Sequence, residues 1–197
     1  MKNINKSSKK ILTSGNHSFI IKKDEELEML ILPAPDKEFN LKIQLVEPGA
    51  SLILKGLAFS KNSEKTKATI LVEHSAPHTT SNQLIKAIAK DSSEIVILGK
   101  IKIDKGADGA EAHLMNKNLL LSNKASIESR PELEIDHDNV ICSHGSATGQ
   151  LDQEALFYLQ SRGLSLKESS NILLESFVKE ILEDEKNQKE ILDYIKN

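Results

Sequence analysis

Between about residues 17 and 141, short apolar runs are interrupted every few residues by Pro, Gly, Asn, Asp or Lys. Within the run Leu41-Lys42-Ile43-Gln44-Leu45, apolar and polar residues alternate, which sends the apolar side chains to one face of a strand. The pattern therefore predicts many short β-strands. The predicted strands include Phe19 to Ile21, Met29 to Leu32, Leu41 to Val46, Leu52 to Leu54, Ala68 to Val72, Ile95 to Leu98, Leu119 to Leu121 and Leu133 to Ile135.

No amphipathic helix separates these predicted strands. The pattern thus argues against an α/β sheet and favours a sandwich, a barrel or a β-solenoid. We favour the solenoid because the strands are short and aromatic residues make up only 4% of the chain. Asn and Ser also recur where we expect coil corners, although no strict repeat is visible. These expected corner residues are Asn82, Asn118, Ser122 and Asn123.

The pattern changes abruptly after Gly149. Residues 152–162 predict a helix that ends at Gly163, because glycine readily takes the left-handed conformation found at helix ends. The spacing of Ser165 and Glu168 is that of a capping box and predicts the start of a second helix. Apolar residues at helical spacing continue this helix and predict a weaker third one: Ile172, Leu173, Phe177, Ile181 and Leu182, then Ile191, Leu192 and Ile195.

The chain therefore divides into a flexible N-terminus (1–16), a β core (17–149) and a C-terminal helical segment (150–197). Its 197 residues fit one domain with a small appendage. The net charge of -3 and the absence of Trp argue against nucleic acid as a partner. No apolar run approaches the roughly 20 residues that span a bilayer, and no signal peptide pattern is present. We expect a cytoplasmic protein that does not bind membranes.

Cys142 is the single cysteine, which excludes an internal disulfide and any metal site built from several cysteines of one chain. Cys142 and His144 are two residues apart, so on a strand both side chains face the same way and could bind one iron. Alternatively, Cys142 is a small buried hydrophobic residue beside Val140 and Ile141, and His144 only forms a hydrogen bond at a turn. The spacing alone leaves both interpretations open.

The other histidines are weaker candidates. His113 and His137 are possible outer ligands, but isolated surface histidines are far commoner. His74 and His78 have helical zinc-site spacing, yet Pro77 between them argues against a helix. We therefore interpret His74 and His78 as coil-corner residues.

Two carboxylates offer a different chemistry. Glu132 and Glu134 lie on one face of a predicted strand and could form the acid and base pair of a carbohydrate-cleaving β-helix enzyme. A solvated outer strand face explains them more simply. No aromatic sugar platform accompanies the two glutamates, and we keep this enzyme as the alternative function.

Three blocks of sequence near the C-terminus resemble the SufB/SufD family of iron–sulfur cluster assembly proteins. They are Arg130 to Ile135 (RPELEI), Val140 to Gly149 (VICSHGSATG) and Leu156 to Gly163 (LFYLQSRG). The resemblance extends upstream through Asn116 to Ser122 and, more loosely, through His78 to Ser81. The Cys-Ser-His-Gly form is similar to SufD rather than to SufB, whose cysteine lies on an earlier coil. Family members commonly carry an additional N-terminal helical region, so this chain resembles a short form.

The resemblance implies a fold and a function. It implies a right-handed parallel β-helix followed by a small helical segment. It also implies a non-catalytic scaffold of the SUF machinery that pairs with a SufB-like subunit or a second copy of itself and docks the SufC ATPase. ATP hydrolysis would come from that partner, because this sequence has no Walker motif. A purely structural SufC-binding subunit without metal remains a further alternative.

The resemblance also assigns roles to residues. His144 matches a position implicated in cluster assembly at the subunit interface, and Cys142 is the second candidate ligand beside it; iron or an iron–sulfur cluster would be held there transiently. No stably bound cofactor is expected in the isolated chain. The helical segment that includes Leu156, Phe157, Arg162 and Gly163 matches the region where the family binds its ATPase. From the sequence alone, Arg162 complements the helix dipole and Gly163 permits the chain to reverse.

Overall fold

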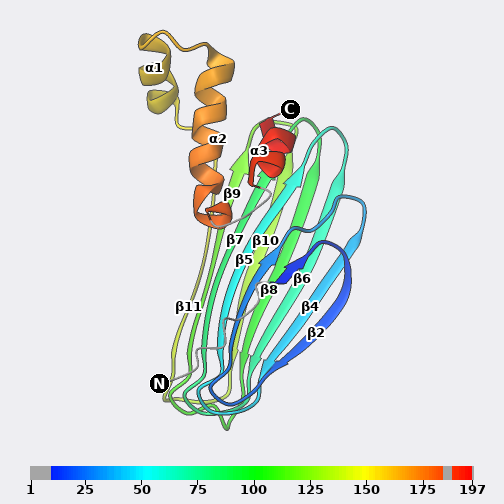
Figure 1. Ribbon diagram of the computed structural model, residues 1–197, viewed down its shortest axis with the longest axis vertical. Helices are drawn as coiled ribbons and strands as arrows, with labels where there is room; N and C mark the ends of the chain where they lie inside the picture. The colour runs from blue at the N-terminus through cyan, green and yellow to red at the C-terminus, as the bar shows by residue number, and fades with distance from the viewer. Residues whose placement is uncertain (1–9, 184–187, 197) are drawn as a thin grey trace.

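The computed structural model describes residues 10–183 and 188–196. Within these residues, eleven strands precede three helices (Figure 1). The strands are β1 (Lys10–Leu12), β2 (Gly15–Ile21), β3 (Glu26–Ile31), β4 (Glu38–Leu45), β5 (Ser51–Ser60), β6 (Lys65–His74), β7 (Thr80–Ala89), β8 (Glu94–Ile103), β9 (Glu111–Leu120), β10 (Ser126–Ile135) and β11 (Ile141–Gly149). The helices are α1 (Gln153–Ser161), α2 (Leu166–Leu182) and α3 (Gln188–Lys196). None of these helices is both long and apolar enough to cross a membrane.

The strands form two sheets, and the chain alternates between them. One sheet has the order β1-β3-β5-β7-β9-β11 and the other β10-β8-β6-β4-β2. Every pairing is parallel, and each strand pairs with the strand two further along the chain. Each circuit of the chain therefore adds one strand to both sheets. This arrangement confirms the predicted parallel β-solenoid with C-terminal helices.

Successive coils share the same kinds of hydrogen bonds and the same kinds of corner residues. Five hydrogen bonds that involve side chains join residues 29 positions apart. At one end of the strands, Asp36, Asn62 and Asp91 have φ of 55°, 57° and 59°. Asp and Asn tolerate this left-handed conformation better than most residues. The corner chemistry thus recurs in each coil, although the spacing varies too much to appear as a strict sequence repeat.

The opposite corner uses glycine and histidine at the corresponding turn. Gly49, His78 and Gly109 have φ of 78°, 54° and 65°. A Cβ at Gly109 would lie 2.6 Å from the Nδ1 atom of His78, so glycine leaves room for that ring. His78 therefore lies at a coil corner, as we expected. Asn82 and Asn118 do not, because they lie within β7 and β9.

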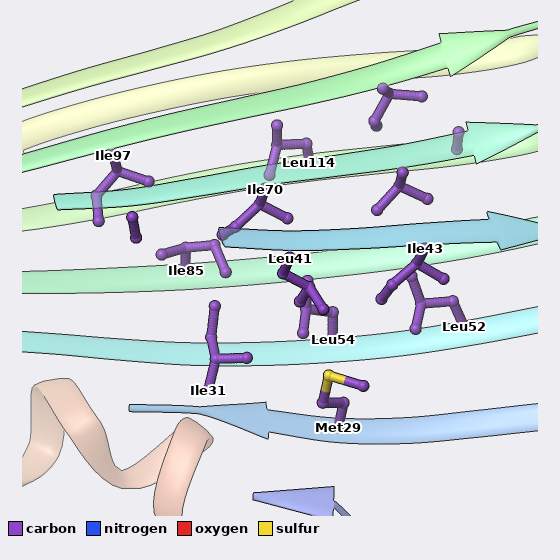
Figure 2. Packing of buried hydrophobic residues seen from close by; sticks show 14 of the residues in the cluster. Met29, Ile31, Leu41, Ile43, Leu52, Leu54, Ile70, Ile85, Ile97 and Leu114 are labelled. Carbon is purple, nitrogen blue, oxygen red and sulfur yellow. The ribbon is translucent and has the colours of Figure 1, made fainter. Parts of the chain in front are cut away.

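The main core lies inside the solenoid, where side chains from both sheets meet (Figure 2). Its members include Met29, Ile31, Leu41, Ile43, Leu52, Leu54, Ile70, Ile85, Ile97 and Leu114. A second apolar cluster lies on the outer face of the β1-to-β11 sheet, where Val178 and Ile181 of α2 and Ile195 of α3 pack against Leu57 and Ile88. Helices α2 and α3 therefore pack on the β body.

The solenoid begins earlier than we expected. Strand β1 and the start of β2 fall within residues 1–16, which we expected to be flexible. β1 pairs with β3 from Lys10 to Leu12. A three-residue strand is too short to show alternation, so the pattern did not reveal it. Residues 1–9 of that range lie outside the described residues.

His74 lies inside the core rather than at a corner. In the parallel register, His74 lies between Leu45 of β4 and Ile103 of β8, and its side chain is fully buried. Its Nδ1 and Nε2 atoms lie 2.8 Å from the hydroxyl oxygens of Thr79 and Ser81. Because the Thr79 hydroxyl donates to a backbone carbonyl, it accepts from Nδ1, and Ser81 donates to Nε2. Burial lowers the pKa of His74 to about 4, so the folded protein holds the neutral form.

Mild acid should destabilise the protein through His74. The pKa falls from its ordinary 6.5 to about 4 on folding, so the unfolded chain binds the proton first as the pH falls. With about 1.4 kcal/mol for each pKa unit, we expect this group to remove about 2 kcal/mol of unfolding free energy between pH 7 and pH 5. Chemical denaturation at both pH values measures the loss.

The control for this prediction is His74→Leu, which copies Leu45 in the preceding coil. The variant should lose about 2 kcal/mol less than wild type over the same pH interval. An equal pH dependence in both proteins would contradict the assignment to His74.

Candidate functional site

The last coil of the solenoid leaves two strand edges open. β10 pairs only with β8 and β11 only with β9 among the described residues. In a parallel ladder the N–H and C=O of one residue point to the same side, and successive residues alternate. The bond from the Ile141 N–H to the carbonyl of Ala110 fixes this phase. The backbone groups of residues 142, 144, 146 and 148 therefore point to the free edge.

The free edge of β10 contains a proline. The bond from the Ser126 N–H to the carbonyl of Ser93 shows that even-numbered residues of β10 face β8. Pro131 therefore lies at a free-edge position, where its missing N–H removes no hydrogen bond from the sheet. The sequence thus tolerates proline in β10 because this strand ends its sheet.

Cys142 and His144 face the interior of this last coil. The register aligns Cys142 with Ala112 and His144 with Leu114, both of which are buried in the core. This agrees with the shared face expected from their spacing, and metal binding by the pair stays a prediction. No group of three or more His, Cys, Asp or Glu side chains in the described residues is arranged to hold a metal ion. Further ligands would have to come from elsewhere.

The Cys142 thiol is protonated near neutral pH in the single chain. Partial burial raises its pKa, which the backbone N–H of Ala112 opposes only in part. A thiol must lose its proton to bind a metal. Metal binding by Cys142 would therefore require a cation or another group that stabilises the thiolate.

Polar side chains replace apolar ones inside the last coils. Asn116 donates across the interior to the hydroxyl of Ser129 at 2.8 Å, and Asn118 donates to the hydroxyl of Thr148 at 3.0 Å. The Oδ1 atom of Asn116 is buried without a hydrogen-bond partner. The sequence did not reveal this group, because Asn118 resembled a corner residue. The open end thus has a polar inner surface, whereas the earlier coils bury mainly apolar side chains, with His74 and Gln83 among the polar exceptions.

His113 and His137 do not join Cys142. His113 lies on the outer face of β9, with Nδ1 at 2.7 Å from the Ser143 hydroxyl and Nε2 at 3.2 Å from the Glu111 carboxylate. His137 lies in the turn before β11, where its Nδ1 atom accepts the backbone N–H of Asn139. The structure therefore places neither candidate outer ligand on the inner face.

Glu132 and Glu134 project outward from β10 into a charged surface. Glu134 forms an ion pair with Lys100, whose ammonium lowers the pKa of that carboxyl through a hydrogen bond. Lys42 and Glu73 form a similar pair at 2.9 Å on the same sheet. This solvated ladder supports the simpler interpretation of the two glutamates. Glycoside hydrolysis requires a carboxylic acid with a raised pKa, whereas the pKa of Glu134 is lowered.

Helix α1 and the start of α2 form a hairpin, and α1 stands apart from both sheets (Figure 1). Asp152 caps α1, and Ser165 with Glu168 forms the predicted capping box of α2. Gly163 between the helices has φ of 95°. This left-handed backbone agrees with the helix end that we expected there.

The predicted docking residues differ in exposure. Leu156 is only 7% exposed, whereas its neighbour Phe157 is 74% exposed. Arg162 lies at the end of α1, with its guanidinium 5.2 Å from the centre of the Tyr158 ring. Phe157 and Tyr158 are therefore the large apolar side chains of α1 that a partner could reach, and Leu156 belongs to internal packing.

A buried lysine of the solenoid forms hydrogen bonds to two residues of α2. Lys86 on β7 donates to the carbonyl of Phe177 at 2.7 Å and to the carboxylate of Glu180 at 2.9 Å. Its side chain is 5% exposed, and that of Glu180 is 57% exposed. The hydrogen bond from Lys86 lowers the pKa of Glu180. No sequence pattern indicated this pair, because its members are 94 residues apart.

Glu180→Gln should destabilise the protein more than Lys86→Met. Gln leaves the Lys86 ammonium buried without its counter-charge, and we expect a loss of about 1–2 kcal/mol because water partly screens the exposed carboxylate. Met removes the buried charge and keeps the apolar stem, so the change should stay below about 1 kcal/mol. Denaturant unfolding of both variants measures the difference. A larger loss for Lys86→Met would contradict this account.

Comparisons with known proteins agree with the sequence resemblance. The family described as "SUF system FeS cluster assembly, SufBD core domain" matches residues 2–177. An iron–sulfur cluster assembly SufBD family protein of Synechocystis sp. is 42% identical over 168 residues, which cover 76% of this chain and 37% of that protein.

Two further relatives are more distant. The iron–sulfur cluster assembly protein SufD of Escherichia coli is 32% identical and is matched over 73% of this chain and 34% of that protein. Protein ABCI7, chloroplastic, of Arabidopsis thaliana is 36% identical over 65% of this chain and 26% of that protein. The chain thus spans about a third of the length of the curated relatives it matches.

Proposed function

This chain belongs to the SufB/SufD family of SUF-system iron–sulfur cluster assembly proteins, and we propose that it is a SufD-like scaffold that pairs through the open end of its solenoid. The paired scaffold docks a SufC-type ATPase through the α1–α2 hairpin and holds iron or a cluster transiently. The observation that carries this proposal is the position of Cys142 and His144 on the polar inner face between two free strand edges. A cytoplasmic location stays a prediction from the sequence.

Pairing at this end would satisfy backbone groups that the single chain leaves open. A second solenoid placed against β10 and β11 can continue one or both sheets, because free N–H and C=O groups pair readily with another strand. The polar interior beside these edges would then be enclosed between two subunits. A SufB-like subunit and a second copy of this chain both fit this requirement.

Ligand number supports the same arrangement. Iron–sulfur clusters are commonly held by four protein ligands, and Cys142 with His144 supplies two. A second chain at the open end could supply the others. The cluster is cargo in this scheme, which fits a thiol whose pKa burial raises in the single chain.

Ser146→Pro should weaken pairing. The N–H of Ser146 points to the free edge of β11, so proline removes a donor for a partner strand while the bonds to β9 remain. We expect light scattering to show wild-type dimers, or complexes with a SufB-like subunit, at micromolar concentration, and at least tenfold weaker association of the variant.

Ser18→Pro is the matched control for this experiment. Among the described residues, Ser18 lies at a free-edge position of β2, which ends the other sheet at the opposite end of the solenoid. Its substitution should leave association unchanged. A strictly monomeric wild-type chain, with and without the partner subunits, would exclude pairing at this end.

Cys142→Ser and His144→Ala should each lower the iron retained by the anaerobically reconstituted complex. Each substitution should change the apo-protein's free energy of unfolding by no more than about 1–2 kcal/mol, because both side chains are at least partly exposed. Iron and sulfide assays measure the first effect and thermal unfolding the second.

His113→Ala serves as the control, because His113 lies on the outer face of the neighbouring strand and should not change the iron content. Iron content equal to wild type in the Cys142→Ser, His144→Ala double variant would remove the site. The chain would then be an ATPase-docking scaffold without metal.

A further inference from the structure

A cleft of about 550 Å³ lies between the α1–α2 hairpin and the adjoining end of the solenoid. Leucines from both parts line it, among them Leu120, Leu121, Leu151, Leu156, Leu166 and Leu174. Leu166 is 58% exposed, so part of this apolar wall is open to solvent. The volume and the mixed lining are those of a binding site for a few side chains or a small ligand.

The charged residues of the cleft are mainly basic. Lys90, Lys167 and Lys196 line it together with a single carboxylate, that of Asp91. The Asp91 carboxylate accepts a backbone N–H from Asn62 at 2.9 Å. The Lys196 ammonium forms an ion pair of 2.8 Å with Glu175.

Lys90 and Lys167 therefore give the cleft a positive charge. Neither forms an ion pair with a carboxylate in the part of the chain that the structure describes. The whole chain carries a net charge of -3, so the charge of the cleft is opposite in sign to the net charge of the chain. An anionic group is the occupant whose charge complements it.

We propose that this cleft binds an acidic segment of the docked ATPase partner, with an apolar side chain against the leucine wall and carboxylates near Lys90 and Lys167. The inference rests on the proposed function, because it names the contact through which the partner binds. The buried Leu156 forms part of the cleft wall and is followed in the chain by the exposed Phe157, so one partner could contact both the cleft and Phe157. Burial of the apolar side chain provides affinity, and the lysines select for sign and orientation.

The test is the affinity of charge variants for the SufC-type ATPase of the same cell, measured by calorimetry at low and high salt. The Lys90→Glu, Lys167→Glu variant should bind at least about tenfold more weakly, and its affinity should depend less on salt than that of wild type. Lys90→Gln with Lys167→Gln, which adds no repulsion, should give a smaller loss in the same direction.

The matched control is Lys22→Glu with Lys105→Glu, which changes the net charge equally at exposed positions beyond the opposite ends of the strands. Binding within twofold of wild type is expected for it. Equal affinity of the cleft and control variants for the ATPase would overturn the inference. A small anion would then be the remaining candidate ligand of the cleft.

Phe157→Glu separates this inference from the proposed function. If Phe157→Glu weakens binding and the cleft variants do not, the hairpin docks the ATPase but the cleft takes no part. If the wild-type chain does not bind the ATPase, docking itself is wrong. Loss of affinity in both variants, with the lysine control unchanged, supports the cleft as a partner site.

Discussion

A solenoid pairs the backbone of each coil with the next coil, so its last coil always leaves an open edge on each sheet. In this chain the open edges are those of β10 and β11. Helices α2 and α3 pack their apolar residues on the outer face of the β1-to-β11 sheet, so the packing of these two helices does not use the edges of β10 and β11. The face that we propose for pairing is therefore a consequence of how the backbone pairs, and polar residues surround Cys142 and His144 there.

The interior of the solenoid becomes more polar towards the open edges of β10 and β11. Early coils bury mainly Ile, Leu and Met between the sheets (Figure 2), with His74 and Gln83 as polar exceptions. The last coils place Asn116, Asn118 and Ser129 inside and leave one buried amide oxygen of Asn116 without a partner. Such groups cost stability unless they are satisfied. Polar side chains at this end can bind water in the single chain and could bind groups of a second subunit in the proposed complex.

Much of the fold could be predicted from the sequence, because it depends on local alternation and caps. The strand pattern, the helix end at Gly163 and the capping box of Ser165 and Glu168 needed no tertiary information. The shared face of Cys142 and His144 followed from their spacing alone. Corners of variable length hid the repeat, and contacts distant in sequence placed His74 in the core and Lys86 beneath α2. The burial of Leu156 required the position of α1 against α2.

Hydrogen exchange of the backbone amides, compared between the isolated chain and its anaerobically purified complex, tests the role of the open end most directly. The free-edge amides of β11, at residues 142, 144, 146 and 148, should exchange rapidly in the isolated chain. They should become protected in the complex, because they gain partners on a second subunit. Unchanged exchange at these amides, with new protection at the edge of β2 instead, would show that the chains pair at the other end of the solenoid.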